Sequence, residues 1–596
     1  MTFKRIFVLT VAALLFTGIT ESFANDKNDK KNAKAAEESA GWNESQMQQP
    51  ATESLDLGMY NAIRDEGLEH SHVMDYAGGL IDGIGPRLTG SPNMAKANAW
   101  TRDQLSKMGC VNAHLEDWGE FGMGWQQVNT WVRMVEPDTA IFVAQATPWS
   151  PSSNGPVKAE AVSVVINDEA DIAKYKGKLG GKIVLLGAMR EVPSTDKPFF
   201  ERNTEKDLKE LEAYPVENGN ADMQARIDRY MKRIALTRKI LPFLTEEKPA
   251  GVIVPSRDGK NGGGTGIIFD DNGAALGRTP YHRDTAVPFP VVVTQIESYG
   301  RVFRLLKHNV PVTIEMNVET KFSGDHEHGF NTIAEIPGTD PKLKDEIVMV
   351  GGHLDSWIAG TGATDNGAGS IVALEVMRIL TSLNAKPRRT IRIALWSGEE
   401  EGLFGSHGYA KEHFGSYPLS TAPDQLNMPE FIRKPAGPLA IKPEQKMISA
   451  YFNVDNGTGK IRGIYTQSNG AVYSIFKQWM EPLADLGVTS ITNQNTGGTD
   501  HLSFDAVGIP GFQFIQDDAD YETRTHHSNL DTYEHLVPGD LKQIATVEAI
   551  FVYNAAMRDQ MIPRKPFPHP ELRDQQNAPL PGLYPTATPG DASATN

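Results

Sequence analysis

Cysteine is almost absent from this 596-residue chain, which contains only Cys110. One cysteine cannot form an intrachain disulfide, so the fold must be held together without a disulfide framework. Cys110 follows Met108 and Gly109 at the end of a helical pattern. We interpret it as a small buried hydrophobe and not as a nucleophile.

Positive charge is also in deficit, since 58 Lys and Arg residues face 75 Asp and Glu residues and the formal net charge is −17. A surplus of negative charge argues against a general nucleic-acid binder, because the phosphate backbone attracts positively charged surfaces. The remaining composition, with 40% hydrophobic and 22% charged residues, is that of a globular protein. We therefore expect no nucleic-acid partner.

The N terminus lacks an apolar run long enough to span a membrane. Lys4 and Arg5 precede an apolar stretch over residues 6–19, and about 14 apolar residues fall short of the ~20 that a spanning helix needs. Small residues before the end of this region predict a signal peptide over residues 1–24, cleaved after Ala24. No cysteine follows that could carry a lipid. We expect an exported protein, periplasmic or secreted, without a stable membrane anchor.

Changes of sequence character divide the chain into segments. Residues 25–54 are polar and lack hydrophobic periodicity, which predicts a disordered linker. Residues 55–130 carry helical patterns, and residues 131–321 are strand-rich with a charged helical stretch, which suggests an inserted β-rich domain. Residues 322–563 alternate strands and helices, and the tail 564–596 is Pro-rich. The alternation predicts an α/β fold with a mostly parallel central sheet flanked by helices.

The chain is organised around residues 346–370. An apolar run over residues 347–350 is typical of a strand buried on both faces, and His353 and Asp355 follow it with side chains on one side of the strand. Asp365 comes next, in Gly- and Asn-rich sequence before a helical pattern. A polar loop with solvated acids would explain this stretch equally well. Open α/β sheets, however, place their sites at such strand ends.

Three further strand ends carry potential metal ligands. They are the acidic run Glu399, Glu400 and Glu401, then Asp455, and then the pair His526 and His527. Each one alone is typical of a solvated turn or a polar surface loop. Together, imidazoles and carboxylates without cysteine favour a catalytic zinc site over a structural one. One glutamate of the run could bind the metal while its neighbour serves as general base.

These motifs resemble a family of zinc exopeptidases that includes bacterial co-catalytic aminopeptidases, glutamate carboxypeptidase and, closest in layout, carboxypeptidase Q. The family pattern is H-x-D, D-N-x-x-[GS], E-E-x-G, a later D and H-[ST]-x-x-D-T. The matching residues here are His353-Leu354-Asp355, Asp365-Asn366-Gly367-Ala368-Gly369, Glu399-Glu400-Glu401-Gly402, Asp455 and His527-Ser528-Asn529-Leu530-Asp531-Thr532. The resemblance covers about residues 55–130 and 322–560, and the strand-rich insertion resembles a protease-associated domain.

The resemblance implies two Zn²⁺ ions per chain and a role for each motif residue. One ion is bound by His353, Asp365 and Asp455, and the other by Asp365, Glu400 and His527, with Asp365 bridging. Glu399 is the implied general base, and Asp355 the partner that orients His353. Family members often have a tyrosine before the last histidine as oxyanion donor. His526 stands there, so His526, His501 or no side chain fills this role.

The expected substrate is a peptide or dipeptide cleaved at a terminal bond, and a homodimer is possible. The pattern does not distinguish an aminopeptidase from a carboxypeptidase or a dipeptidase. Two alternatives share the fold, namely a catalytically inactive receptor or binding protein and a glutaminyl cyclase-like transferase. The insertion could also be a binding module, although it has no catalytic cluster and we expect it to cover the cleft and restrict substrates.

Overall fold

The computed structural model describes residues 49–192, 197–213, 220–257, 266–269, 280–422, 425 and 433–565. The predicted signal peptide 1–24, most of the linker 25–54 and nearly all of the tail 564–596 lie outside the described residues. Among the helices that the structure does describe, none has the length and apolar character needed to cross a bilayer.

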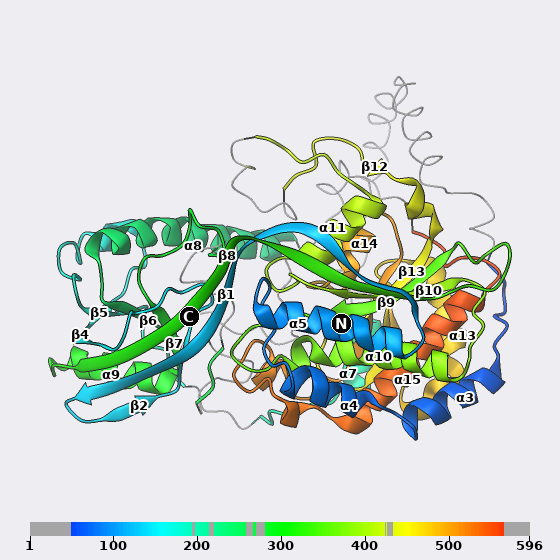
Figure 1. Ribbon diagram of the computed structural model, residues 1–596, viewed down its shortest axis with the longest axis horizontal. Helices are drawn as coiled ribbons and strands as arrows, with labels where there is room; N and C mark the ends of the chain where they lie inside the picture. The colour runs from blue at the N-terminus through cyan, green and yellow to red at the C-terminus, as the bar shows by residue number, and fades with distance from the viewer. Residues whose placement is uncertain are drawn as a thin grey trace, which may run out of the picture.

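A central sheet forms the larger body of the molecule (Figure 1). In sheet order its strands are β15 (Ser490–Thr492), β14 (Ile461–Tyr465), β16 (Gly511–Gln516), β13 (Ile448–Asn453), β9 (Ile347–His353), β10 (Thr390–Trp396), β8 (Thr313–Ile336) and β1 (Val111–Glu136). The four central strands β16, β13, β9 and β10 run parallel, so their carboxyl ends meet at one edge. The predicted α/β fold with a mostly parallel central sheet is confirmed.

Helices cover both faces of this sheet, as an apolar parallel sheet requires. One face packs against α3 (Leu57–Leu68), α4 (Val73–Ala77), α5 (Pro92–Lys107), α10 (Ala368–Ser382), α13 (Tyr473–Met480) and α15 (Pro538–Met557), and the other against α11 (Phe404–His413) and α14 (His501–Asp505). Side chains alternate along β9 accordingly: Val348 and Val350 pack toward α10 and α15, whereas Met349 packs toward α11 and α14. The apolar run that predicted a doubly buried strand is therefore β9.

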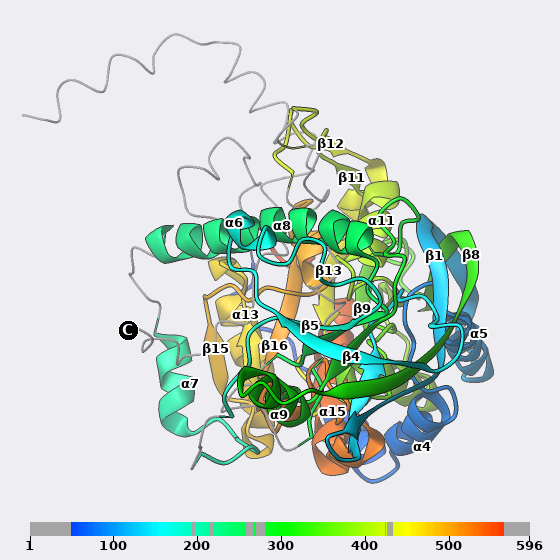
Figure 2. The same ribbon diagram turned by 90° about the vertical axis from the view of Figure 1, so that its left-hand side faces the viewer.

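Among the inserted residues, α7 (Glu205–Glu212) packs against β15 of the main body. Most of the others form a second lobe beside that body (Figures 1 and 2). Its elements are β2 (Ala140–Phe142), β3 (Ala144–Ala146), β4 (Val157–Val164), α6 (Glu169–Ile172), β5 (Ile183–Leu186), α8 (Asn220–Glu247), β6 (Gly251–Pro255), β7 (Val291–Thr294) and α9 (Ile296–Lys307). Strands β4 to β7 are parallel. Ile183 and Leu185 pack with α9 and Val184 with α8, so these two helices cover opposite faces. The lobe is thus a mixed α/β layer structure.

Strands β1 and β8 join the two lobes, and the sheet is continuous through them. They pair antiparallel along almost their whole length and cross the predicted segment limits at residues 130 and 322. The first part of β1, up to Thr130, is not recognisable as a strand from its sequence, because glycines such as Gly119, Gly122 and Gly124 accompany repeated register shifts. Such bulges break the period-two alternation of side chains.

Residues shortly before the predicted start at Leu55 also pack onto the main body. Glu53 is buried and its carboxylate pairs with Arg558, with a 2.8 Å contact to the guanidinium Nε. At the other end Arg564 is buried and donates to the backbone carbonyls of Gln445 and Ile448. The last residues of the predicted linker and the first of the predicted tail therefore pack onto the main body.

Candidate metal centre

The carboxyl ends of four parallel strands bring the predicted site residues together. His353 ends β9, Asp455 follows β13, the acidic run follows β10, and the two histidines follow β16 and the short helix η7 (Tyr521–Thr525). Asp365 lies in η2 (Ala363–Gly367), directly before α10. Their convergence follows from the strand order, because β16, β13, β9 and β10 are neighbours in the sheet.

One group of ligand atoms surrounds His353. Its Nε2 lies 3.3 Å from Asp455 Oδ1 and 3.4 Å from Asp365 Oδ1. All three side chains are buried, and one ligand atom from each lies within 4.8 Å of the others. An imidazole nitrogen and two carboxylate oxygens in such proximity form a suitable three-ligand set for a divalent metal ion.

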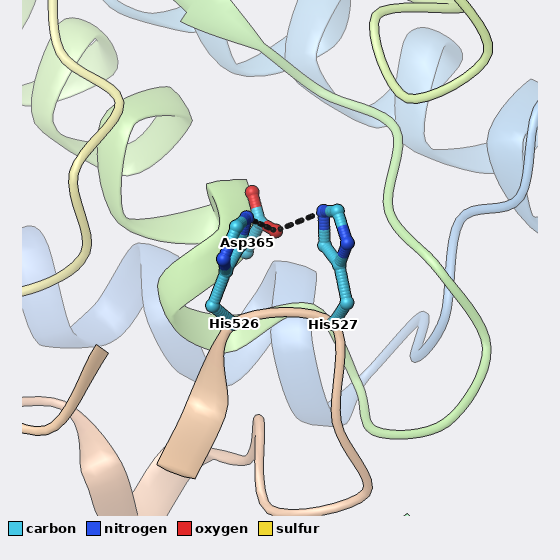
Figure 3. A group of neighbouring side chains, drawn as sticks. All are labelled: Asp365, His526 and His527. Carbon is cyan, nitrogen blue, oxygen red and sulfur yellow. Dashed lines mark ion pairs between the residues drawn. The ribbon is translucent and has the colours of Figure 1, made fainter. Parts of the chain in front are cut away.

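A second group lies on the other side of the same aspartate. His527 Nε2 is 3.1 Å from Asp365 Oδ2 and 3.0 Å from Glu400 Oε2. Figure 3 shows the two adjacent imidazoles, those of His526 and His527, on either side of the Asp365 carboxylate. His526 Nε2 is farther away, 3.8 Å from Asp365 Oδ2. The two oxygens of Asp365 thus point to two different histidines, His353 and His527.

Two buried aspartates orient these residues. The backbone carbonyl of Asp355 is 3.1 Å from His353 Nδ1, and its Oδ2 accepts hydrogen bonds from Thr89 Oγ1 and the Glu400 amide. Asp531 accepts from the backbone amide of Asp365 at 3.2 Å. Such contacts fix ring orientation and carboxylate position before any metal binds.

The acidic run separates into three different environments. Glu399 Oε2 approaches His353 Nε2 only to 3.9 Å, whereas Glu400 Oε2 lies against His527. Among the described residues, Glu401 pairs with neither imidazole. Burial, with the nearby Asp355 carboxylate, raises the pKa of Glu401 well above the ordinary value. Neighbouring glutamates therefore face different partners, as two separate functions would need.

Buried charges perturb the proton affinities of this cluster. Burial lowers the pKa of His527, but the Glu400 and Asp365 carboxylates outweigh it and raise that pKa to about 10. Burial, followed by repulsion from Asp365, raises the pKa of Glu400 to about 7. Burial also raises the pKa of Glu399 well above its ordinary value. Carboxylates so close together repel each other, and a bound cation relieves that repulsion.

A residue without any signal in the sequence supports the loop between His353 and Asp365. Arg87 is fully buried and donates from its guanidinium to the carbonyls of Leu354, Thr361 and Gly362. The sequence around Arg87, GIGPRLTGSPN, is rich in Gly and Pro, which indicates a loop and nothing more. Its function depends on carbonyls more than 260 positions away in the chain, and a local pattern cannot indicate such contacts.

The two histidines proposed as oxyanion donors lie in different places. His526 is stacked on Tyr521 with ring centroids 4.7 Å apart and lies beside Asp365. His501 is buried, and its Nε2 is 2.9 Å from Gln467 Nε2 and 3.2 Å from the Thr496 carbonyl. Burial lowers the pKa of both imidazoles to about 3. Of the two, His526 is the one that contacts the ligand cluster.

The donor set fits a pair of divalent cations. Nitrogen and oxygen ligands converge from five side chains, and Glu400 Oε1 is buried without a hydrogen-bond partner among the described residues. An unpaired buried carboxylate oxygen is unfavourable unless a cation or donor satisfies it. The protein thus offers an oxygen-rich, partly preformed set of ligands for metal ions.

Known proteins are similar to this chain in sequence and in fold. Residues 331–552 match peptidase family M28. Carboxypeptidase Q from Mus musculus is 24% identical over 565 residues, which cover 94% of this chain and all of the mouse protein. The predicted resemblance to co-catalytic zinc exopeptidases is confirmed by these matches. The same matches confirm the predicted enzyme class, a metallo-exopeptidase.

Solved structures of M28 peptidases have the same architecture. A peptidase M28 precursor from Shewanella amazonensis SB2B has a TM-score of 0.60 at 23% identity and covers 86% of this chain and 98% of its own. The zinc aminopeptidase BSAP from Bacillus subtilis has a TM-score of 0.50 at 18% identity, with coverages of 82% and 95%. These similarities extend over the inserted lobe as well as the M28 domain, since both exceed four fifths of the chain.

Proposed function

We propose that this protein is an exported enzyme that hydrolyses terminal bonds of peptides or dipeptides with two zinc ions per chain. The observation that carries the proposal is the position of Asp365 between His353 and His527. In this arrangement His353, Asp365 and Asp455 hold one ion, and Asp365, Glu400 and His527 hold the other. Zinc is favoured because the ligands are imidazoles and carboxylates and because BSAP is a zinc aminopeptidase.

The protein residues around the ions divide the catalytic work. Zinc held by these residues would supply Lewis acidity toward the scissile carbonyl and would lower the pKa of a water molecule. Glu399 accepts the proton of the attacking water and returns it to the leaving amine, which suits a carboxylate that faces the cluster without contacting His527. Asp355 holds the ring of His353 in place from the Nδ1 side.

His526 is the better placed of the two proposed oxyanion donors. Its imidazole lies beside Asp365, on the same loop as His527, whereas His501 is held by Gln467 and Thr496. A ring N–H aimed at the developing negative charge of the tetrahedral intermediate would stabilise it. We therefore assign this role to His526 and not to His501.

The inserted lobe, predicted as residues 131–321, is proposed to be a protease-associated domain that limits access to the cleft. Its segment around residues 266–269 lies against the loop of His527, which supports a position at the site. A homodimer is the proposed oligomeric state.

The test is metal analysis together with a product assay on the purified mature protein. We expect two zinc ions per chain and release of free amino acids from unblocked dipeptides and short peptides. N- or C-terminally blocked peptides then distinguish aminopeptidase, carboxypeptidase and dipeptidase activity. A protein that binds no metal and stays inactive with added zinc is the inactive-receptor alternative, and pyroglutamate as product indicates the glutaminyl cyclase-like alternative.

A further inference from the structure

The inserted lobe contacts the loop that carries His527 at more than one place. Arg257 donates from its guanidinium to the His526 carbonyl at 3.1 Å, and residues 266–269 make a more extensive contact. This second contact is centred on Asn529: its amide donates to the Ile268 carbonyl at 2.9 Å, and its Oδ1 accepts from the Ile268 amide at 2.7 Å. Its Nδ2 donates to the Gly266 carbonyl at 3.3 Å, and Phe269 forms a β-bridge with Ser528. A single asparagine thus uses its backbone and both ends of its side chain to bind one segment of the lobe.

The contacting segment, residues 266–269, is in turn fixed to the lobe. The Gly266 amide donates to Glu297 Oε1 of α9 at 3.1 Å, and the Phe269 amide donates to Ser256 Oγ, which follows β6, at 2.8 Å. Ile268 is 2% exposed, so its amide depends on Asn529 for a partner. A continuous path of hydrogen bonds therefore runs from α9 through residues 266–269 to the loop next to His527.

The loop itself needs external support. His527 has a backbone φ of 59°, in the left-handed region that non-glycine residues rarely adopt. Such a conformation persists only where the surroundings determine it. Asp531 holds the far end of the loop through its contacts with Thr364 and Asp365. Asn529 lies between His527 and Asp531, at a variable position of the family pattern, so the resemblance assigns it no function.

We infer that Asn529 is a positioning residue through which the inserted lobe holds His527 in place for metal binding. The inference rests on the proposed function, because it concerns the ion bound by Asp365, Glu400 and His527. Partners that orient metal ligands without touching the metal commonly change metal affinity by about 10–100-fold when removed. The ion bound at His353 does not depend on this contact, because His353 is held by the end of β9 and by Asp355.

The experiment measures the affinity of each zinc ion by chelator competition in the full-length mature protein. Asn529→Ala is expected to weaken one of the two ions about 10–100-fold and leave the other unchanged. Excess zinc should restore most of the turnover, which a purely structural defect would not allow. Glu297→Ala, which removes the support of residues 266–269 at a distance from the loop, should weaken the same ion, and Glu297→Gln, which keeps Oε1, should restore its affinity.

Arg301→Ala serves as the matched control on the same helix. Arg301 pairs with exposed Asp138 at 2.7 Å and not with residues 266–269, so its loss should leave both affinities as in the wild type. Wild-type affinities in folded Asn529→Ala would overturn the inference. So would an equal loss of affinity in Arg301→Ala, which would indicate general loosening of the lobe. Fewer than two zinc ions in the wild type would instead contradict the proposed function, and the inference would fall with it.

Discussion

The two halves of the candidate metal centre are built differently. His353 ends a central strand, its side chain is 1% exposed, and the sheet and Asp355 hold it from within the main body. His527 lies on a loop, its side chain is 20% exposed, and part of its support comes from the inserted lobe. One half of the site therefore belongs to the core of the fold, whereas the other half depends on contact between the lobes.

Removing the residue that both halves share should have the largest effect. Asp365→Ala is expected to lose both zinc ions and all measurable turnover, because each oxygen of Asp365 faces a different histidine. Metal content per chain and hydrolysis of an unblocked dipeptide check this. Asp138→Ala, at an exposed aspartate of the other lobe, is the control and should keep both ions. Retention of one tightly bound ion in Asp365→Ala would refute the bridging role.

The general base should affect the rate without affecting either half of the metal site. Glu399→Gln is expected to keep both ions and lower kcat by about 10²–10⁴-fold, as the loss of a general base typically does. Glu401→Gln is the matched control, since Glu401 is the third member of the same acidic run and, unlike Glu399 and Glu400, pairs with neither His353 nor His527 among the described residues. Near-normal activity in Glu399→Gln, together with metal loss in Glu401→Gln, would mean that the motif must be aligned one residue later.

The position of His353 could be predicted from the sequence more completely than that of His527. Apolar runs ending in His353, Trp396 and Asn453 indicate buried parallel strands, and their order in the chain suffices to expect a shared edge. The supports at Arg87 and Asn529 could not be predicted, because each bonds to backbone groups more than 250 positions away. The long strand pair β1 and β8 could not be predicted for a different reason, because bulges disrupt the alternation of its side chains.

His526 offers a smaller effect on the loop-borne half. His526→Ala should lower kcat by about 10²–10³-fold, the usual effect of losing one oxyanion donor, while zinc content and KM remain close to the wild type. His501→Ala is the comparison variant, because His501 is buried beside Gln467 and does not contact the cluster. Its folded fraction should retain the wild-type kcat. Equal losses of kcat in both variants would argue against a specific role for His526.

The smallest expected effect is a difference between the two ions in the unaltered protein. The ion bound through His527 should leave first during chelator titration, because its loop is more exposed than the end of β9 and is held partly by another lobe. We expect the two dissociation constants to differ by about tenfold, or ~1.4 kcal/mol. Glu400→Gln should widen this gap, since the Glu400 carboxylate pairs with His527, and Asp455→Ala should close or reverse it, since Asp455 contacts His353. Simultaneous loss of both ions in all three proteins would mean that the halves act as one unit, and the comparison between a core half and a lobe-dependent half would no longer hold.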